Sequence, residues 1–156
     1  MNIRLAEPCD IGRLAELLYQ VHDVHSAGRP DIFRKGNRKY NDEELLRILE
    51  NESTPVFVAT DDEGYVLGYA FCILEEHRGE AALTDRKTLY IDDLCVDEAA
   101  RGKGIGRELY NFAVNFAKES GCYNLTLNVW VDNVSALGFY EALGLHKQKI
   151  GMELIL

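Results

Sequence analysis

The sequence is poor in the residues that build metal-stabilised or disulfide-stapled folds. Its 156 residues include only 4 cysteines and 4 histidines, and no two cysteines have the C-x-x-C spacing that is typical of zinc and redox sites. We therefore expect no metal. Cys72 and Cys95 fall in predicted strands, where they should be small buried hydrophobic side chains.

Long apolar runs and an excess of basic charge are also missing. No stretch approaches the ~20 apolar residues of a membrane-spanning helix, and the first residues lack the apolar core of a secretion signal. The chain has 26 acidic and 17 basic residues and a net charge of −9. Because nucleic-acid binding needs a basic surface, we expect no nucleic acid among the partners. Because apolar runs and a secretion signal are missing, we expect no membrane partner and a cytoplasmic location.

What is present is the composition of an ordinary globular domain. Apolar residues make up 47% and charged residues 28% of the chain, and a chain of this length can bury a core without covalent staples. No repeat, linker or low-complexity tract divides the sequence. We therefore expect one domain over residues 1–156.

The order of predicted elements is typical of a mixed α/β (α+β) fold. Helical periodicity predicts helices at 11–25, 41–49, 105–120 and 133–143, and strand patterns occur at 2–7, 55–60, 65–75, 88–96, 123–131 and 147–156. The early strands should form an antiparallel meander, and strand–helix–strand over 88–131 predicts one parallel crossover. Asn41 with Glu44 is a capping-box signature, and Asp10 fits a helix N-cap.

The most informative stretch, YIDDLCVDEAARGKGIGREL at 90–109, joins a strand to a helix through a basic, glycine-rich loop. Glycines let the backbone approach a phosphate and aim several N–H groups at it, and the dipole of the following helix adds partial positive charge. The spacing fits neither the Walker loop nor the dinucleotide fingerprint. We predict that this loop holds a pyrophosphate; the simpler alternative is a glycine turn without a ligand.

Two segments, in this order, resemble the GNAT superfamily of acyl-CoA-dependent N-acetyltransferases. The R-G-K-G-I-G of 101–106 resembles its pyrophosphate motif, and NVSALGFYEALGL at 133–145 resembles its N-x-x-A-x-x-F-Y-x-x-x-G-F segment, with Leu145 in place of Phe. The resemblance is good over 89–145 and topological before that. It implies a GNAT-like mixed central sheet of about six to seven strands, with an antiparallel N-terminal meander, one parallel crossover after the pyrophosphate loop and about four helices.

The resemblance also implies a binding site for acetyl-CoA, the acyl donor. The loop amides would hold the pyrophosphate, the strand backbone at 94–96 would pair with the pantetheine arm beside a bulge that opens the cleft, and two side chains of the last helix region would line the thiol end. The residues concerned are Leu94, Cys95, Val96, Arg101, Gly102, Lys103, Gly104, Ile105, Gly106, Arg107, Asn133 and Tyr140.

Direct transfer to an amine needs a base for the ammonium proton and an acid for the leaving thiolate. Tyr140, with an ordinary pKa of ~10, is the predicted acid; alternatively it only anchors the last helix. The strand Y-I-D-D-L-C-V resembles that of spermidine/spermine acetyltransferase, which makes Asp92 the predicted base or ammonium anchor. Asp93 should point to the opposite face of the strand. Asp93, a water relay or a purely structural role of Asp92 remain alternatives.

Side chains near the end of the first helix could form the acceptor side. His22 and His25 lie there with Tyr19 and Phe33 as apolar walls, and Trp130 follows a later strand. A partly exposed helix end and a core tryptophan are the simpler interpretations.

The leading hypothesis is an N-acetyltransferase that moves an acetyl group from acetyl-CoA to a primary amine, a small cationic amine by preference. The alternatives are a protein or peptide N-acetyltransferase and a non-catalytic acyl-CoA-binding module; acyl groups other than acetyl also stay open. A single C-terminal strand at 147–156 has an edge whose backbone groups need a partner. Because that edge can pair across a dimer, we expect a homodimer.

Overall fold

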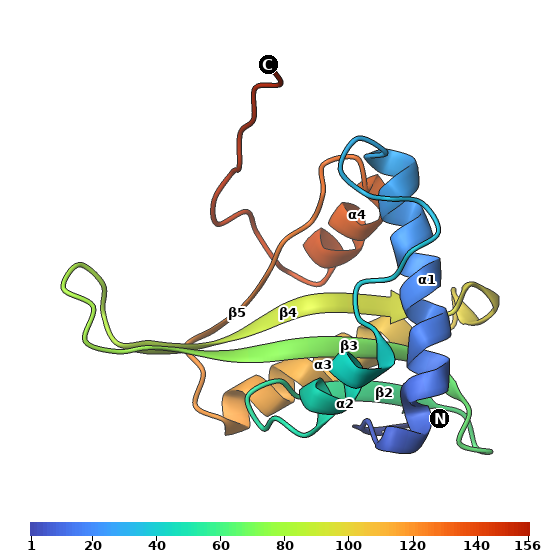
Figure 1. Ribbon diagram of the computed structural model, residues 1–156. Coiled ribbons are helices and arrows are strands. Elements are labelled where there is room, and N and C mark those ends of the chain that lie inside the picture. Colours follow the sequence, from blue (N-terminus) through green and yellow to red (C-terminus); the bar gives the residue numbers. More distant parts are fainter.

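A five-stranded sheet in the order β1-β2-β3-β4-β5 forms the centre of the computed structural model, which describes residues 1–156 (Figure 1). The strands are β1 (Asn2–Leu5), β2 (Val56–Thr60), β3 (Val66–His77), β4 (Arg86–Val96) and β5 (Asn124–Leu127). Pairing is antiparallel from β1 to β4 and parallel between β4 and β5. The α/β class, the antiparallel meander and the single parallel crossover are thus confirmed.

Helices cover both faces of the sheet (Figure 1). The four α-helices are α1 (Ile11–Gly28), α2 (Asp42–Leu49), α3 (Ile105–Glu119) and α4 (Val134–Ala142), and two single turns, η1 (Pro8–Asp10) and η2 (Glu98–Ala100), precede α1 and α3. On one face Leu17 and Leu45 of α1 and α2 pack with Tyr69 of β3. On the other face Leu109 of α3 packs with Leu89 of β4. The sheet therefore separates two hydrophobic cores.

The local signals at helix starts have mixed outcomes. Asn41 and Glu44 form the predicted capping box: each side chain accepts the other's backbone N–H, at 2.9 and 2.8 Å. Asp10 stands at the start of α1, but its carboxylate binds Arg4 at 2.7 and 2.9 Å and the Glu7 N–H at 2.8 Å. The prediction that the Asp10 side chain caps α1 is wrong because this ion pair outcompetes the cap.

The strand count is the main correction to the predicted fold. The sheet has five strands instead of six to seven: residues 147–156 form no strand, and the strand expected at 123–131 is reduced to β5. Strand-like sequence forms a strand only where a neighbouring edge satisfies its backbone N–H and C=O groups, and neither 128–131 nor 147–156 pairs with a strand in this chain. No helix is long and apolar enough to cross a membrane.

Candidate active site

A bulge in β4 lies where this strand parts from β5. The β3–β4 register pairs Phe71 with Asp93 and Cys72 with Ile91, so that Asp92 is an extra residue on β4. On the other side, the last β4–β5 pair is Ile91 with Leu127. Because a bulge bends a strand and ends regular pairing, β4 and β5 diverge from this point (Figure 1). The divergence leaves the end of β4 with an unpaired backbone edge.

The backbone directions along β4 show which residues face this edge. The Asp97 N–H donates to the Leu67 carbonyl beside β3, at 2.9 Å. Since these directions alternate along a strand, the groups of Cys95 point to β3 and those of Leu94 and Val96 point to the open edge. Of the three residues expected to pair with pantetheine, Leu94 and Val96 therefore direct their backbone to the open edge, where the Val96 carbonyl already accepts from Arg101 Nε, at 3.1 Å. Cys95 instead buries its side chain among α1 and β3.

The loop after β4 presents a run of free donors. The backbone N–H groups from Gly102 to Arg107 donate to no group of the chain, and the next one along, that of Glu108, closes the first turn of α3 on Gly104. Gly102 and Gly104 have φ of 78° and 82°, a left-handed conformation that favours glycine. Free amides at a helix N-terminus form an anion site. The predicted pyrophosphate loop thus has the geometry that the sequence implied.

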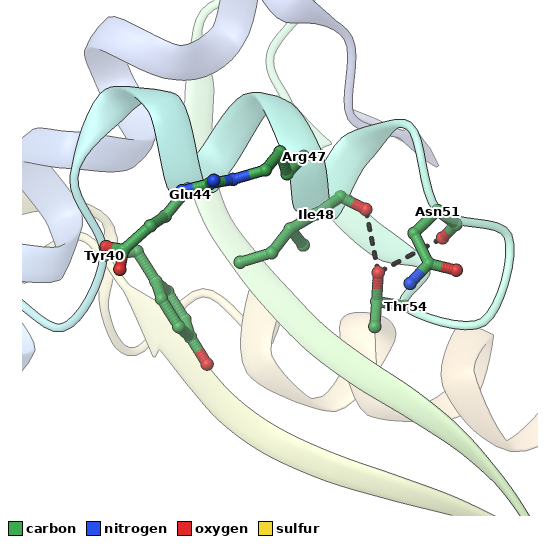
Figure 2. A pocket seen from close by; sticks show the side chains of 6 residues that line it. All are labelled: Tyr40, Glu44, Arg47, Ile48, Asn51 and Thr54. Carbon is green, nitrogen blue, oxygen red and sulfur yellow. Dashed lines mark hydrogen bonds between the residues drawn. The ribbon is translucent and has the colours of Figure 1, made fainter.

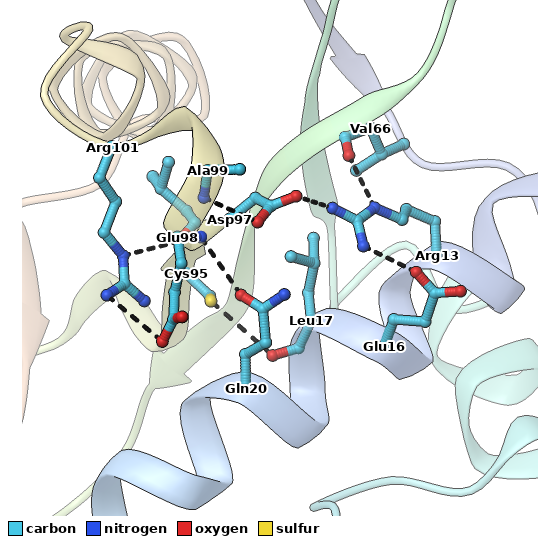
Figure 3. A network of polar contacts seen from close by, with 11 residues as sticks. Arg13, Glu16, Leu17, Gln20, Val66, Cys95, Asp97, Glu98, Ala99 and Arg101 are labelled. Carbon is cyan, nitrogen blue, oxygen red and sulfur yellow. Dashed lines mark hydrogen bonds and ion pairs between the residues drawn. The ribbon is translucent and has the colours of Figure 1, made fainter.

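A polar network behind this loop ties it to α1 (Figure 3). Asp97 pairs with Arg13 and accepts an N–H of η2 at 3.1 Å. Burial opposes ionisation of Asp97, but this N–H and the Arg13 charge outweigh it and hold the pKa below its usual range. The Glu98 N–H donates to Gln20 at 3.3 Å, and Arg101 Nε donates to a β4 carbonyl at 3.1 Å. The network fixes the position from which the glycine loop starts.

The two carboxylates of the bulge lie on the same side of the sheet. Asp92 contacts Lys39 and Tyr40, which precede α2, and Asp93 contacts Tyr69, which belongs to the core under α1 and α2. The prediction that they point to opposite faces is wrong, because the extra residue of the bulge breaks the strict alternation of a strand.

The partners of the two carboxylates differ. Lys39 Nζ lies 2.7 Å from both oxygens of Asp92, and the Tyr40 hydroxyl donates to Asp92 at 2.6 Å. Asp93 has no cation in hydrogen-bonding distance and accepts from the Tyr69 hydroxyl, at 2.9 Å. Burial raises the pKa of Asp93 to about 6, although the Tyr69 hydroxyl opposes the shift. Asp93 is therefore the carboxylate that titrates near neutral pH.

Tyr140 of α4 lies within the electrostatic reach of Asp93. Its hydroxyl makes no hydrogen bond within the chain, and burial, with the negative charge of Asp93, raises its pKa above the ordinary value. A phenol in this environment keeps its proton at neutral pH. The structure thus brings Tyr140, Asp93 and, one residue away, Asp92 to the point where β4 and β5 part.

Aromatic side chains line the end of α1. Phe33 stacks on His25 at 5.2 Å between ring centroids and meets Trp130 edge-on at 5.4 Å. Burial and the nearby His22 lower the pKa of His25, which is therefore neutral at pH 7. A cavity of about 90 Å³ adjoins them, lined by Val24, His25, Gly28, Arg29, Trp130, Asp132 and Asn133. The predicted acceptor-side residues do gather in one place, with Tyr19 exposed outside the cluster.

Asn133 has a local role in the structure. Its side-chain oxygen accepts the Ala136 N–H at 3.1 Å and so caps α4. The side chain also borders the cavity at the end of α1. Asn133 therefore orients the helix that carries Tyr140.

A second hollow, of about 280 Å³, runs along α2 (Figure 2). Tyr40 and Ile48 form its apolar part, Arg47 lies on its rim, and Thr54 closes one end by donating to the Ile48 carbonyl at 2.8 Å. Tyr40 is its only link to the carboxylates, through the bond to Asp92. Its lining contains neither the glycine loop nor Tyr140, so we do not place acetyl-CoA in it.

Three residues of the site were missed in the sequence: Lys39, Tyr40 and Tyr69. Lys39 and Tyr40 lie in an irregular segment between two helices, where no periodicity predicts a direction. Tyr69 stands in an apolar strand, where a core role is the default expectation. The one signal in the sequence was the tyrosine hydroxyls: a buried hydroxyl needs a hydrogen-bond partner, which indicates polar groups nearby.

The chain belongs to the GNAT family of acetyltransferases. The model of the acetyltransferase (GNAT) family matches residues 18–145, which include β4, the glycine loop, α3, β5 and α4. Membership agrees with the split between β4 and β5 and with the free amides of the loop.

Similar proteins cover several kinds of acetyltransferase. A crystal structure of a mutant BH1408 protein from Bacillus halodurans is 35% identical, with a TM-score of 0.96 over 100% of this chain and 99% of that one. The N-alpha-acetyltransferase MAK3 of Arabidopsis thaliana is 37% identical, over 67% of this chain and 60% of the relative. Glucosamine 6-phosphate N-acetyltransferase of the same plant is 28% identical, over 74% and 67%. The chain thus spans about two thirds or less of these two curated relatives.

Proposed function

We propose that this protein transfers an acetyl group from acetyl-CoA to a primary amine by direct attack of the amine on the thioester. The observation that carries the proposal is the meeting of three features at one split in the sheet: free loop amides, an open β4 edge and Tyr140 within the electrostatic reach of Asp93. The loop amides bind the pyrophosphate, with charge added by Arg101 and Arg107. Family membership supports acetyl-CoA as the acyl donor.

In the proposed reaction the acceptor amine first loses a proton to Asp93, directly or through water. A carboxylate with a pKa of about 6 is a better base for this step than an ordinary aspartate. The neutral amine attacks the carbonyl carbon, and an N–H of the open β4 edge stabilises the oxyanion. The C–S bond then breaks, and Tyr140 gives its proton to the leaving thiolate. Asp92, which binds Lys39 and Tyr40, places a negative charge beside the amine.

A small cationic amine fits the charge of the site. Asp92 and Asp93 face the single ammonium of Lys39, so the bulge keeps a negative charge that attracts a cation. The aromatic rings at the end of α1 add apolar and cation–π surface.

A peptide acceptor is the second candidate, favoured by the 37% identity to an N-alpha-acetyltransferase. A panel of polyamines, amino sugars and short peptides, assayed by release of free CoA thiol, separates the two acceptor classes. Saturable binding of CoA without turnover on any amine would instead support the non-catalytic acyl-CoA-binding module.

The variant Tyr140→Phe tests the chemical step. We expect kcat on the best acceptor to fall about 10²-fold or more, with CoA affinity unchanged, because only the donated proton is lost. Tyr110→Phe is the matched control: it removes a neighbouring hydroxyl that has no part in the proposed reaction. Unchanged turnover by Tyr140→Phe would exclude Tyr140 as the acid.

We also propose a cytoplasmic location and a homodimer. The acidic composition and reduced cysteines support the first, and the exposed apolar C-terminal segment supports the second.

A further inference from the structure

A primary ammonium of the chain itself lies at the β4 bulge. Lys39 Nζ lies 2.7 Å from each carboxylate oxygen of Asp92 and 5.4 Å from the centroid of the Tyr40 ring. The Tyr40 hydroxyl donates to the same carboxylate at 2.6 Å. A carboxylate beside an aromatic face is an arrangement that binds ammonium groups. In the free protein this arrangement is filled by the protein's own lysine.

The carboxylate and the phenol are held by the sheet, whereas the lysine is held by the carboxylate alone. The Asp92 side chain is 14% exposed and belongs to the extra residue of the bulge. Tyr40 packs its ring against Phe71 of β3, at 5.7 Å between centroids. The Lys39 side chain is 44% exposed, and both of its hydrogen bonds go to Asp92. Breaking this one ion pair therefore frees the lysine and leaves the other two groups in place.

The segment that carries Lys39 allows such a release. It joins α1 to α2 over residues 29–41, and its residues 34–40 form no hydrogen bond to another backbone group. Backbone without such bonds moves at little cost in free energy. An ion pair with an exposed partner is also a weak restraint, because water solvates the released ammonium. Lys39 can therefore leave Asp92 while the sheet and the helices keep their positions.

The charge of Lys39 acts on both sides of the proposed acceptor site. Burial raises the pKa of Asp93, the proposed base, and the Lys39 charge opposes this rise. Burial lowers the pKa of His25, and the charges of His22 and Lys39 add to this effect. His25 lines the cavity at the end of α1. The Lys39 ammonium therefore lies near the base and near the wall of this cavity.

We propose that Lys39 is a specificity-determining residue, whose ammonium occupies the place of the acceptor's ammonium on Asp92 and must be displaced by it. The Lys39 side chain is a primary ammonium on an unbranched four-carbon stem, so the fitting acceptor carries a primary ammonium on an unbranched alkyl chain. The exchange replaces one monocation by another, so the charge on Asp92 stays compensated. That the displacing amine then receives an acetyl group rests on the proposed function; the exchange does not.

Nuclear magnetic resonance tests the exchange without acetyl-CoA and without turnover. In the full chain the Cε signal of Lys39, assigned by its absence in Lys39→Gln, should move to the range of exposed lysines when n-butylamine saturates the site. The backbone amide signals of Asp92 and Asp93 report that saturation. Butyltrimethylammonium has the same charge but no N–H group to donate to the two carboxylate oxygens, so it should leave the Lys39 signal in place.

Variants measure how much the tethered ammonium weakens binding. The acceptor binds only those molecules in which Lys39 has left Asp92, so Lys39→Gln should lower the dissociation constant of n-butylamine about tenfold. Lys35→Gln is the matched control, because it removes the same charge from an exposed side chain of the same segment, and it should bind like the wild type. Lys39→Arg keeps an occupying cation and should retain the weak binding.

Steady-state kinetics separate this role from a structural one. In Lys39→Gln the KM for the acceptor should fall by the same factor as the dissociation constant, with kcat little changed at pH 8. If Lys39 only held its segment in place, the KM would rise.

Two results would overturn the inference. One is a Lys39 signal that stays in place while n-butylamine shifts the Asp92 amide signal, and the other is an amine affinity in Lys39→Gln that is equal to or below that of the wild type. Exchange at Asp92 without turnover on any amine would keep the inference and count against the proposed function alone. Turnover whose KM is the same in Lys39→Gln and wild type would do the reverse.

Discussion

Asp93 carries an energetic cost at neutral pH that follows from its place on the β4 bulge. Burial raises its pKa to about 6, whereas an unfolded aspartate has a pKa of ~3.9. Between these values the native state binds more protons than the unfolded state, so that stability falls as pH rises from about 4 to about 6. This difference of two pKa units corresponds to a loss of at most about 3 kcal/mol in the free energy of unfolding.

The variant Asp93→Asn should therefore be more stable than the wild type above pH 6. Asparagine removes the buried charge and still accepts the Tyr69 hydroxyl, so we expect a gain of about 1–3 kcal/mol at pH 8 that shrinks towards zero below pH 4. Urea unfolding at several pH values measures the difference. Asp92→Asn is the control and should lose stability, because it breaks the contacts to Lys39 and Tyr40. An equal gain at pH 4 and pH 8 would contradict the titration of Asp93.

At the same residue scale, the sequence predicted residue types better than side-chain directions. Tyr140 and the two aspartates were found as chemical groups, and the structure brings them together. The faces of Asp92 and Asp93 were predicted from strict alternation, which a one-residue bulge cancels. Lys39 escaped prediction because its partner is 53 positions away and no local pattern encodes that contact.

Among the elements, the segments with strong local chemistry were predictable and those that need a neighbour were not. The capping box of α2 and the glycine loop are encoded within a few residues, and each has the expected geometry. The segment at 147–156 has the alternation of a strand, but alternation specifies a face and not a partner. β5 likewise ends where its pairing with β4 ends.

Gly104→Ala tests how far the glycine loop depends on its backbone. A Cβ at Gly104 meets no atom within 4 Å, so the cost arises from φ of 82° and should be about 1–2 kcal/mol of stability. CoA affinity should fall in addition, because relief of the strained φ turns neighbouring N–H groups away from the pyrophosphate. Thermal unfolding and titration calorimetry measure the two effects.

Gly12→Ala in α1 is the matched control for this variant, since its Cβ also meets no atom within 4 Å and its φ is not left-handed. There we expect a small gain in stability, about 0.5–1 kcal/mol, and unchanged CoA binding. Equal CoA affinity in Gly104→Ala and wild type would mean that the loop amides do not hold the ligand.

On the scale of the whole molecule, both faces of the sheet carry a hydrophobic core, but strand pairing is continuous only from β1 to β4. β1 to β4 are bonded along their lengths, while β5 joins through four residue pairs at one end of β4. α3 begins at the loop on one side of the split, and α4 carries Tyr140 on the other. A ligand that fills the split therefore bridges the two parts, and its binding should stabilise the whole fold.

Thermal unfolding with CoA and with pantetheine separates the contributions of the loop and the β4 edge. At 100 times its dissociation constant, a ligand specific for the folded state adds ≈ 2.7 kcal/mol, which corresponds to about 5–10 °C in Tm for a domain of this size. Pantetheine contains the same arm as CoA for pairing with the β4 edge, but it has no pyrophosphate to bind the amides of Gly102 to Arg107. At the same concentration it should shift Tm by a small fraction of the CoA value, and equal shifts would place the binding energy outside the loop.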